Sequence, residues 1–191
     1  DTIQELRDIV VKGRMVQEII PSQQLSGQLL HSLSSHNVAD ALRYFSGVQI
    51  KDYGGVGGFK TVNVRSLGSE HVGVFYDGIE IGNAQNGVVD LGRFSLDNLE
   101  TISLYNGQKS AIFQSAKDFA SASSIYMTTK TPVFKEYKNY NKNITLKAGS
   151  FGLANPSVLW EHKISDKISS SFNADYTSAN GKYRFRQKVE N

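Results

Sequence analysis

The sequence predicts an α+β fold in which a domain of strands and short helices is followed by antiparallel strands. Three observations predict it. Residues 61–107 alternate between apolar and polar side chains, residues 22–47 place apolar side chains at helical spacing, and longer alternating segments follow residue 132. The chain of 191 residues, 39% of them hydrophobic, is long enough for one domain with a core and a smaller second unit.

Two short helices are expected before the first of these strands. The first helix is expected to start at Ser22, and its apolar side chains recur every four residues: Leu25, Leu29 and Leu33. Asn37 is the predicted N-cap of the second helix, which Ser46 and Gly47 end. Its apolar positions have the spacing of a buried helix face: Val38, Ala41, Leu42 and Phe45.

Three strands of one sheet are expected within residues 61–107. Their alternating apolar positions are Val62 and Val64, then Val72, Val74 and Tyr76, and finally Ile102 and Leu104. Gly68 is expected to turn the first strand into the second. Asp77, next to Gly78, is expected to form a tight turn rather than to act as a catalytic acid.

Three more strands are expected after residue 132. Their apolar sides are Ile144, Leu146 and Ala148, then Val158, Trp160, His162 and Ile164, and last Ile168, Ser170, Phe172, Ala174 and Tyr176. Alternating segments with short turns are typical of the strands of a transmembrane barrel. A soluble antiparallel sheet that is buried on one face has the same pattern, so the pattern alone leaves both open.

The excess positive charge lies in the C-terminal part of the chain. Residues 1–132 have 11 Lys and Arg against 13 Asp and Glu, or −2, and residues 133–191 have 10 against 5, or +5. These basic residues are spread over alternating strands instead of gathering on one face, so nucleic-acid binding is not expected. The absence of cysteine excludes disulfides, thiolate metal sites and cysteine nucleophiles.

Nucleotide binding and catalysis are not favoured by the sequence. The glycine-rich stretch DYGGVGGF at residues 52–59 lacks the spacing of the nucleotide-binding glycine motifs, and no βαβ unit follows it. No metal-binding or catalytic motif includes the four histidines: His31, His36, His71 and His162. We therefore expect no catalytic residue, no metal site and no cofactor.

Four short motifs occur in a fixed order along the chain. They are VADALRYFSGV at residues 38–48, VRS at 64–66, YDG at 76–78 and LETISLYNGQ at 99–108. Their order and spacing closely resemble the plug domain of TonB-dependent outer-membrane receptors. Residues 110–130 correspond to a glycine-rich family motif and its closing strand, but other residues replace the family's glycines at Gln114, Lys117, Ala122 and Ser123.

The resemblance implies three parts of the chain. Residues 1–18 would hold an energy-coupling segment and a first strand. Residues 19–132 would form a plug domain with a small mixed β-sheet and short flanking helices, and residues 133–191 the first strands of an outer-membrane β-barrel. Only about three barrel strands are present, so we expect a truncated barrel within a fragment. The chain opens without a basic and apolar leader, so any signal peptide is expected to have been removed.

The resemblance also implies a partner, the periplasmic TonB protein, which pairs with an extended coupling segment as an added strand. Two windows fit that role, residues 1–3 and residues 6–11. We prefer the second, which consists of Leu6, Arg7, Asp8, Ile9, Val10 and Val11. The coupling segment would lie in the periplasm, and the plug would lie inside the barrel in the outer membrane.

By resemblance, the loops at residues 52–59 and 81–89 form the apex of the plug and contact a small-molecule nutrient. The implied substrate-binding residues are Tyr53, Val56, Phe59, Asn83, Gln85 and Asn86. Four charged residues are implied as polar contacts between plug and barrel: Arg65, Glu80, Arg93 and Glu100. The family imports ferric siderophores, haem, corrinoids and oligosaccharides, and we rank iron chelates and corrinoids first. The alternative is a free-standing soluble binding domain, whose gene would stop near Asn191.

Overall fold

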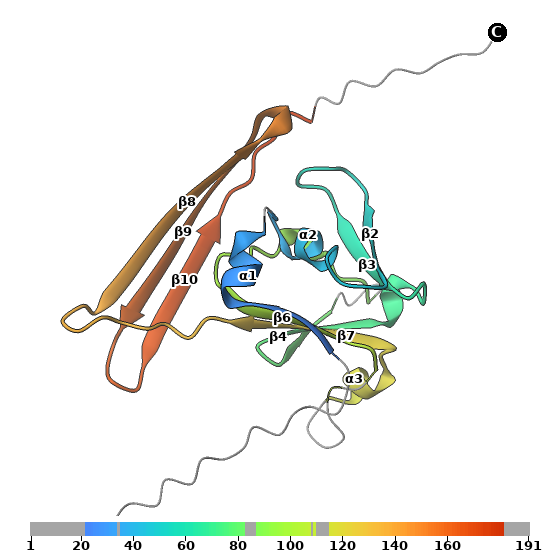
Figure 1. Cartoon of the computed structure of the whole chain (residues 1–191), viewed down its shortest axis with the longest axis horizontal. Helices are drawn as coiled ribbons and strands as arrows, with labels where there is room; N and C mark the ends of the chain where they lie inside the picture. The colour runs from blue at the N-terminus through green and yellow to red at the C-terminus, as the bar shows by residue number, and fades with distance from the viewer. Residues whose placement is uncertain (1–21, 34, 83–86, 108, 110–114, 182–191) are drawn as a thin grey trace, which may run out of the picture.

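The computed structural model describes residues 22–33, 35–82, 87–107, 109 and 115–181 (Figure 1). Its elements follow one another in this order: β1 (Ser22–Ser26), α1 (Gly27–Ser32), α2 (Val38–Leu42), β2 (Val48–Asp52), β3 (Lys60–Val64), η1 (Ser69–His71), β4 (Val72–Tyr76), β5 (Ile79–Ile81), η2 (Leu91–Arg93), β6 (Leu99–Tyr105), α3 (Ala116–Ala120), β7 (Ser123–Thr129), β8 (Tyr140–Gly149), η3 (Ser150–Gly152), β9 (Leu153–Lys163) and β10 (Ser169–Asp175).

A mixed five-stranded sheet forms the centre of the N-terminal domain, which comprises elements β1 to β7. Its strand order is β1-β6-β7-β4-β5, with β4 and β7 parallel and the other neighbours antiparallel. Strands β8, β9 and β10 form a separate antiparallel sheet beside this domain (Figure 1). The predicted α+β class is therefore confirmed, with a small mixed sheet and short helices followed by antiparallel strands.

The prediction of a helix from Ser22 is wrong at its start. Residues 22–26 form β1, which pairs antiparallel with β6 and places Leu25 opposite Ile102. Helix α1 begins only at Gly27, whose φ of +52° permits the abrupt change from strand to helix. Leu25 is buried in β1. An apolar residue at this position suits a buried strand as well as a buried helix, so its spacing could not reveal that the segment pairs with β6.

Helix α2 begins where the sequence predicts. The Asn37 side chain accepts a hydrogen bond from the backbone N–H of Asp40 at 2.9 Å and so caps the helix. Val38 and Leu42 are completely buried on its inner side. The helix ends at Leu42, one turn earlier than predicted, and the turn that follows still places Phe45 in the core.

Strand β3 does not belong to the sheet of β4 and β6, contrary to the prediction. It pairs antiparallel with β2 in a two-stranded sheet, where Val62 lies opposite Ile50, and β7 lies between β4 and β6. Gly68, at a φ of +97°, leads into η1 and redirects the chain instead of closing a hairpin. All five residues of β3 are consequently buried, including the polar Thr61 and Asn63.

The hydrophobic core lies between the five-stranded sheet, the two N-terminal helices, β3 and η2. Its side chains include Leu30, Val38, Leu42, Val62, Val64, Val74, Leu91, Leu99, Ile102, Leu104, Ile125 and Met127. Removal of this apolar surface from water is the main stabilising contribution to the domain. No helix among the described residues is long and apolar enough to cross a membrane.

The three-stranded sheet has one polar and one apolar face. On β9, the side chains facing the N-terminal domain are largely buried, and most of them are polar: Leu153, Asn155, Ser157, Leu159 and Glu161. The opposite face has large exposed apolar residues: Ile144, Leu146, Trp160 and Phe172. The strand register aligns them, because Ile144 lies opposite Val158 and Phe172 opposite Trp160. The three strands predicted after residue 132 are confirmed.

A buried carboxylate holds α3 against the face of the five-stranded sheet that lies opposite the core. Asp118 is completely buried and accepts hydrogen bonds from the hydroxyls of Ser124 and Tyr126, the latter at 2.6 Å. The Tyr126 ring stacks on Phe75 with 4.7 Å between centroids, and Lys109 Nζ lies 4.3 Å from its centroid. Burial and the hydrogen bond to Asp118 raise the pKa of Tyr126.

Replacing Asp118 by alanine is expected to loosen α3 and β7. The hydroxyls of Ser124 and Tyr126 would lose their acceptor, which costs about 1–3 kcal/mol for each buried group. Hydrogen exchange of the β7 amides in the full-length protein should accelerate roughly ten- to a hundredfold. Asp118→Asn retains an acceptor oxygen and should accelerate exchange less. Unchanged exchange in Asp118→Ala, or equal acceleration in both variants, would contradict this role.

Candidate functional site

One carboxylate connects the N-terminal domain to the three-stranded sheet. Asp97, in the turn before β6, accepts a hydrogen bond from Lys147 Nζ at 2.8 Å and another from the Ser157 hydroxyl at 2.6 Å. Burial alone would raise the pKa of Asp97, but the hydrogen bonds from Lys147 and Ser157 outweigh burial and lower it. Asp97 is therefore ionised at neutral pH and holds β8 and β9 against the domain.

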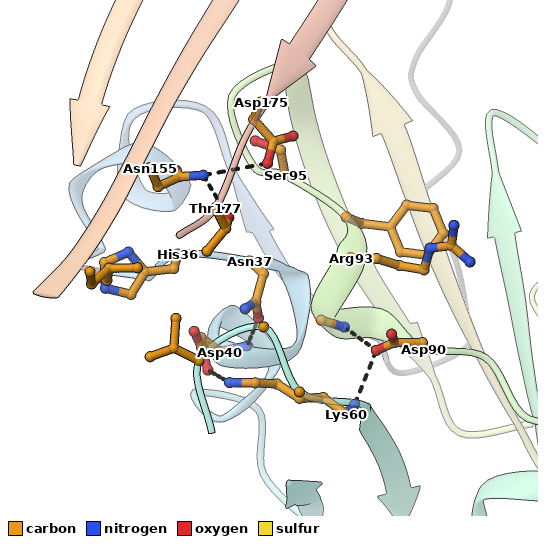
Figure 2. Close-up of a pocket in the computed structure, with 16 residues that line it drawn as sticks. His36, Asn37, Asp40, Lys60, Asp90, Arg93, Ser95, Asn155, Asp175 and Thr177 are labelled. Carbon is orange, nitrogen blue, oxygen red and sulfur yellow. Dashed lines mark hydrogen bonds and ion pairs between the residues drawn. The ribbon is translucent and has the colours of Figure 1, made fainter. Parts of the chain in front are cut away.

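A cavity of about 340 Å³ lies between the two units (Figure 2). The start of α2, the loop at residues 56–58 and the segment around η2 form one side, and β9 and the end of β10 form the other. Its labelled polar residues are His36, Asn37, Asp40, Lys60, Asp90, Arg93, Ser95, Asn155, Asp175 and Thr177. Both units thus contribute polar side chains to a single cavity.

Lys60 is the charged centre on the domain side of this cavity. Its side chain is only 8% exposed, and Nζ lies 3.2 Å from Asp40 Oδ1 and 3.4 Å from Asp52 Oδ2. Asp90 accepts hydrogen bonds from the backbone N–H groups of Lys60 and Gly92, each at 3.0 Å. These contacts connect α2, β2, β3 and η2, so the buried cation is fully compensated and the cavity wall is fixed.

Close backbone packing shapes the glycine-rich loop above Lys60. Asp52 Oδ1 accepts hydrogen bonds from the N–H groups of Gly54 at 3.1 Å and Gly55 at 2.7 Å. These bonds and Lys60 lower the pKa of Asp52, although burial opposes them. A Cβ on Gly58 would lie 2.6 Å from the backbone of Gly54, so only glycine fits there. Gly54 and Gly58 thus serve the close packing of the loop, whereas Gly55 and Gly57 adopt positive φ, at +69° and +77°.

The three-stranded sheet contributes a small hydrogen-bonded cluster to the cavity. Asn155 Nδ2 donates to Thr177 Oγ1 at 2.8 Å and contacts Asp175 Oδ2 at 3.4 Å (Figure 2). Asn155 also lies 3.3 Å from the Tyr176 carbonyl oxygen. This cluster fixes the end of β10 against the start of β9.

The structure describes three of the six predicted substrate contacts, and one of them lines this cavity. Val56 lines it, and Phe59 lines a neighbouring cavity of about 390 Å³ together with Arg93. Tyr53 and Phe59 are exposed, with 5.9 Å between their ring centroids. The other three predicted contacts lie outside the described residues: Asn83, Gln85 and Asn86. The predicted coupling segment, residues 6–11, and its alternative, residues 1–3, also lie outside them.

The four predicted plug–barrel contacts are all exposed in this structure: Arg65, Glu80, Arg93 and Glu100. The structure also places a contact to the three-stranded sheet at Asp97, a residue that the sequence reasoning did not select. Alternation along β8 indicated that Lys147 lies on the polar face. No local pattern indicated that its partner would be 50 residues earlier in the chain.

No cluster of potential metal ligands forms among the residues that the structure describes. None of their His, Cys, Asp and Glu side chains gather in groups of three or more that could hold a metal ion. Asp77 and Gly78 form the turn between β4 and β5, with φ of +48° and +81°. The Asp77 side chain accepts hydrogen bonds from the Thr129 N–H and hydroxyl at 2.8 Å each and so fixes this turn to β7. The arrangement is suited to binding and to holding two units together.

Comparison with known proteins identifies the domain. Residues 16–117 match the family model of the TonB-dependent receptor plug domain, which is more than half of the chain. The chain belongs to this family. The N-terminal domain is therefore a plug domain, and the family is one of receptors and transporters rather than enzymes. The predicted resemblance is confirmed.

Similar proteins include a curated transporter and solved receptors. The chain is 31% identical over 97 residues to the vitamin B12 transporter BtuB of Photobacterium profundum, a match that covers 51% of this chain and 16% of the relative. The siderophore receptor PirA of Acinetobacter baumannii has a TM-score of 0.59 at 17% identity, with coverage of 82% of this chain and 24% of that one. The alcaligin outer-membrane receptor FauA of Bordetella pertussis has a TM-score of 0.62 at 10% identity, with coverage of 84% and 27%.

These structural alignments extend beyond the plug domain. The family match ends at residue 117, and the alignments cover 82% and 84% of the chain, so they include residues of the three-stranded sheet. The likeness in fold therefore includes the sheet as well as the plug. The chain spans about a sixth of the curated relative's length and about a quarter of the solved receptors' length.

The contact between plug and sheet is expected to weaken in acid. The pKa of Asp97 is lowered in the folded protein, so its stabilising contribution is complete at neutral pH. It should decrease once the pH falls below the ordinary carboxyl pKa of about 4 and disappear as the pH falls through the lowered pKa of folded Asp97. The rate of cross-linking between cysteines placed at Ser95 and Asn155, which both line the cavity, would report the loosening. An Asp97→Asn variant whose cross-linking keeps the same pH dependence would contradict this assignment.

Proposed function

We propose that this chain is the plug and the first wall strands of an outer-membrane receptor. The receptor would bind and import a scarce nutrient with energy from the inner-membrane TonB complex. The observation that supports this most is that the three-stranded sheet has one polar and one apolar face. Its polar face packs on the plug domain, and its exposed face holds large apolar residues: Ile144, Leu146, Trp160 and Phe172. Such a face suits contact with lipid tails.

The proposed parts of the chain are those that the sequence predicts. Residues 1–18 would contain the coupling segment, residues 19–132 the plug, and residues 133–191 the first strands of the barrel wall. The boundary at residue 132 agrees with the elements, because β7 ends at Thr129 and β8 begins at Tyr140. In the outer membrane, the plug would lie inside the barrel lumen and the coupling segment would reach into the periplasm.

The nutrient is proposed to bind at the apex of the plug, where Tyr53, Val56 and Phe59 would contact it, together with Asn83, Gln85 and Asn86. We propose a ferric siderophore or a corrinoid such as vitamin B12. The name of the curated relative, a vitamin B12 transporter, supports the corrinoid, and the siderophore receptor among the solved structures supports the iron chelate. Apolar and polar side chains that converge on one site suit such ligands.

Import would require the plug to move relative to the wall. Bound nutrient would bias the plug so that residues 6–11 are presented to the TonB protein, which pairs with them as an added strand. Polar groups between plug and wall would exchange partners as the plug moves: Arg65, Glu80, Arg93, Glu100 and, from the structure, Asp97. No chemical step on the nutrient forms part of this proposal.

Deleting residues 6–11 from the full-length receptor should separate binding from import. Binding of radiolabelled cyanocobalamin to cells should keep its affinity, because the apex is intact, whereas energy-dependent uptake should fall to background. Deletion of residues 1–3 serves as the control and should leave uptake unchanged. Full uptake without residues 6–11 would exclude this segment as the coupling element, and loss of uptake only without residues 1–3 would move the assignment there.

A further inference from the structure

The outward face of the three-stranded sheet, which points away from the plug, differs in character from one end to the other. The strand register aligns its side chains in rows across the strands. The two rows nearest the turn between β9 and β10 are Tyr140, His162 and Ser170, and then Lys142, Trp160 and Phe172. The rows that follow are apolar: Ile144, Val158 and Ala174, and then Leu146 and Pro156. Hydrogen-bond donors therefore gather at one end of an otherwise apolar face.

These donors lie at the end of the sheet that is farther from the glycine-rich loop. Leu153, at the start of β9, lines the same cavity as Val56 of that loop. His162 is nine residues further along β9, which corresponds to roughly 30 Å of extended strand. Figure 1 likewise shows the loop between β2 and β3 at the same end of the molecule as the turn between β8 and β9. With that loop at the extracellular apex, as proposed above, the donors lie at the periplasmic end of the wall.

Lys142 and His162 occupy diagonal positions on neighbouring strands. Lys142 lies opposite Trp160, and His162 is the next outward residue of β9. Diagonal side chains of an antiparallel pair are about 7–8 Å apart, so the Lys142 ammonium and the His162 imidazole can reach the same small group. Both side chains are exposed, and neither has a hydrogen bond or an ion pair within the part of the chain that the structure describes.

The outward positions of β8, β9 and β10 contain no carboxylate. Glu161 and Asp175 belong to the opposite face, where each contacts an asparagine side chain. Asp166, in the turn between β9 and β10, pairs with Lys163 at 2.7 Å. The charge of Lys142 is therefore uncompensated on this face, which favours an anionic ligand and offers no partner to a cationic group.

Two aromatic side chains complete this group of donors. Tyr140 lies opposite His162 and Trp160 opposite Lys142, and the two aromatic residues are 61% and 57% exposed. The phenol hydroxyl and the indole N–H can each donate a hydrogen bond, while both rings are apolar. Tyr and Trp are enriched where the hydrocarbon of a membrane meets its headgroups. The four side chains thus place donors directly beside an apolar surface, which is the arrangement that a lipid headgroup and its acyl chains require.

We propose that these four side chains bind the phosphodiester of an anionic phospholipid in the periplasmic leaflet of the outer membrane. This inference rests on the proposed function, which places the apolar face in lipid and the apex outside. The phosphate oxygens accept hydrogen bonds from Lys142 and His162, and the acyl chains lie along Ile144 and Val158. Because no outward carboxylate is present to pair with a headgroup ammonium, the site prefers phosphatidylglycerol to a zwitterionic lipid. The bound lipid fixes the depth of the wall strands in the membrane.

Photo-cross-linking from a neighbouring position tests which lipid is bound. The photoreactive residue p-benzoylphenylalanine would replace Ser170, which lies opposite His162, in the full-length receptor. The receptor would be reconstituted in vesicles of equal parts phosphatidylcholine and phosphatidylglycerol, and mass spectrometry would identify the cross-linked lipid. Phosphatidylglycerol should exceed phosphatidylcholine about fivefold, the contribution expected of one basic residue near a charged headgroup. The same probe at Ala154, at the other end of this face, should capture both lipids equally.

Equal capture of the two lipids at Ser170 would overturn the proposal. Lipopolysaccharide is the other anionic lipid of an outer membrane, so a second set of vesicles would contain it as well. Capture of lipopolysaccharide at Ser170 in place of phosphatidylglycerol would overturn the assignment to a phospholipid.

Variants test the two basic side chains. Lys142→Met keeps an apolar stem and should reduce the excess of phosphatidylglycerol nearly to equality, and His162→Phe, which removes the ring nitrogens, should reduce it less. Both new side chains suit a lipid-facing position, so the wall should still assemble. Lys51→Met, which changes an exposed lysine of β2, is the matched control and should leave the excess unchanged. An undiminished excess in the variant that combines Lys142→Met with His162→Phe would overturn the site.

Failure of this site and failure of the proposed function give different results. If the phospholipid site alone is wrong, the probes at Ser170 and Ala154 both capture the two lipids equally, while nutrient uptake still requires the coupling segment. If the sheet is not a membrane wall, neither position captures any lipid, and that result would overturn the proposed function together with the site.

Discussion

The contact of Asp97 with Lys147 and Ser157 determines how the two units of this chain are arranged. A half-buried carboxylate is costly unless donors surround it, and here the three-stranded sheet supplies both a cation and a hydroxyl. The sheet is thereby held with its polar face toward the plug. With the sheet in this position, residues of both units line the cavity shown in Figure 2.

The strands after the plug place polar side chains on one face of their sheet and apolar side chains on the other, and the contact at Asp97 holds the polar face toward the plug. The sheet separates a polar side from an apolar side. Asn155, Ser157 and Glu161 lie on the polar face, and Trp160 is among the exposed apolar residues of the other face. The plug occupies the polar side. A nutrient that passes between plug and wall would therefore meet polar side chains from both units, among them Lys60 and Asn155.

Local patterns in the sequence predicted where helices and strands occur better than they predicted which strands pair and which side chains meet. The alternating segments after residue 132 and the cap at Asn37 depend on neighbouring residues, and both were correct. The strand at residues 22–26 was predicted as a helix, because an apolar Leu25 suits either conformation and the pairing with β6, far along the chain, decides between them. Asp97 was missed for the same reason, since its partners lie 50 and 60 residues away.

The most direct test of this account measures which side of β9 faces lipid. Single cysteines for spin labels would be placed at Val158, Leu159, Trp160 and Glu161 of a full-length receptor that has no other cysteine, and the 191 residues of this chain contribute none. The labelled receptor would be studied in lipid vesicles. Accessibility to oxygen, which concentrates in the membrane, should be high at Val158 and Trp160 and low at Leu159 and Glu161. Equal access of a water-soluble relaxation agent to all four positions would contradict a wall strand and favour a soluble binding domain.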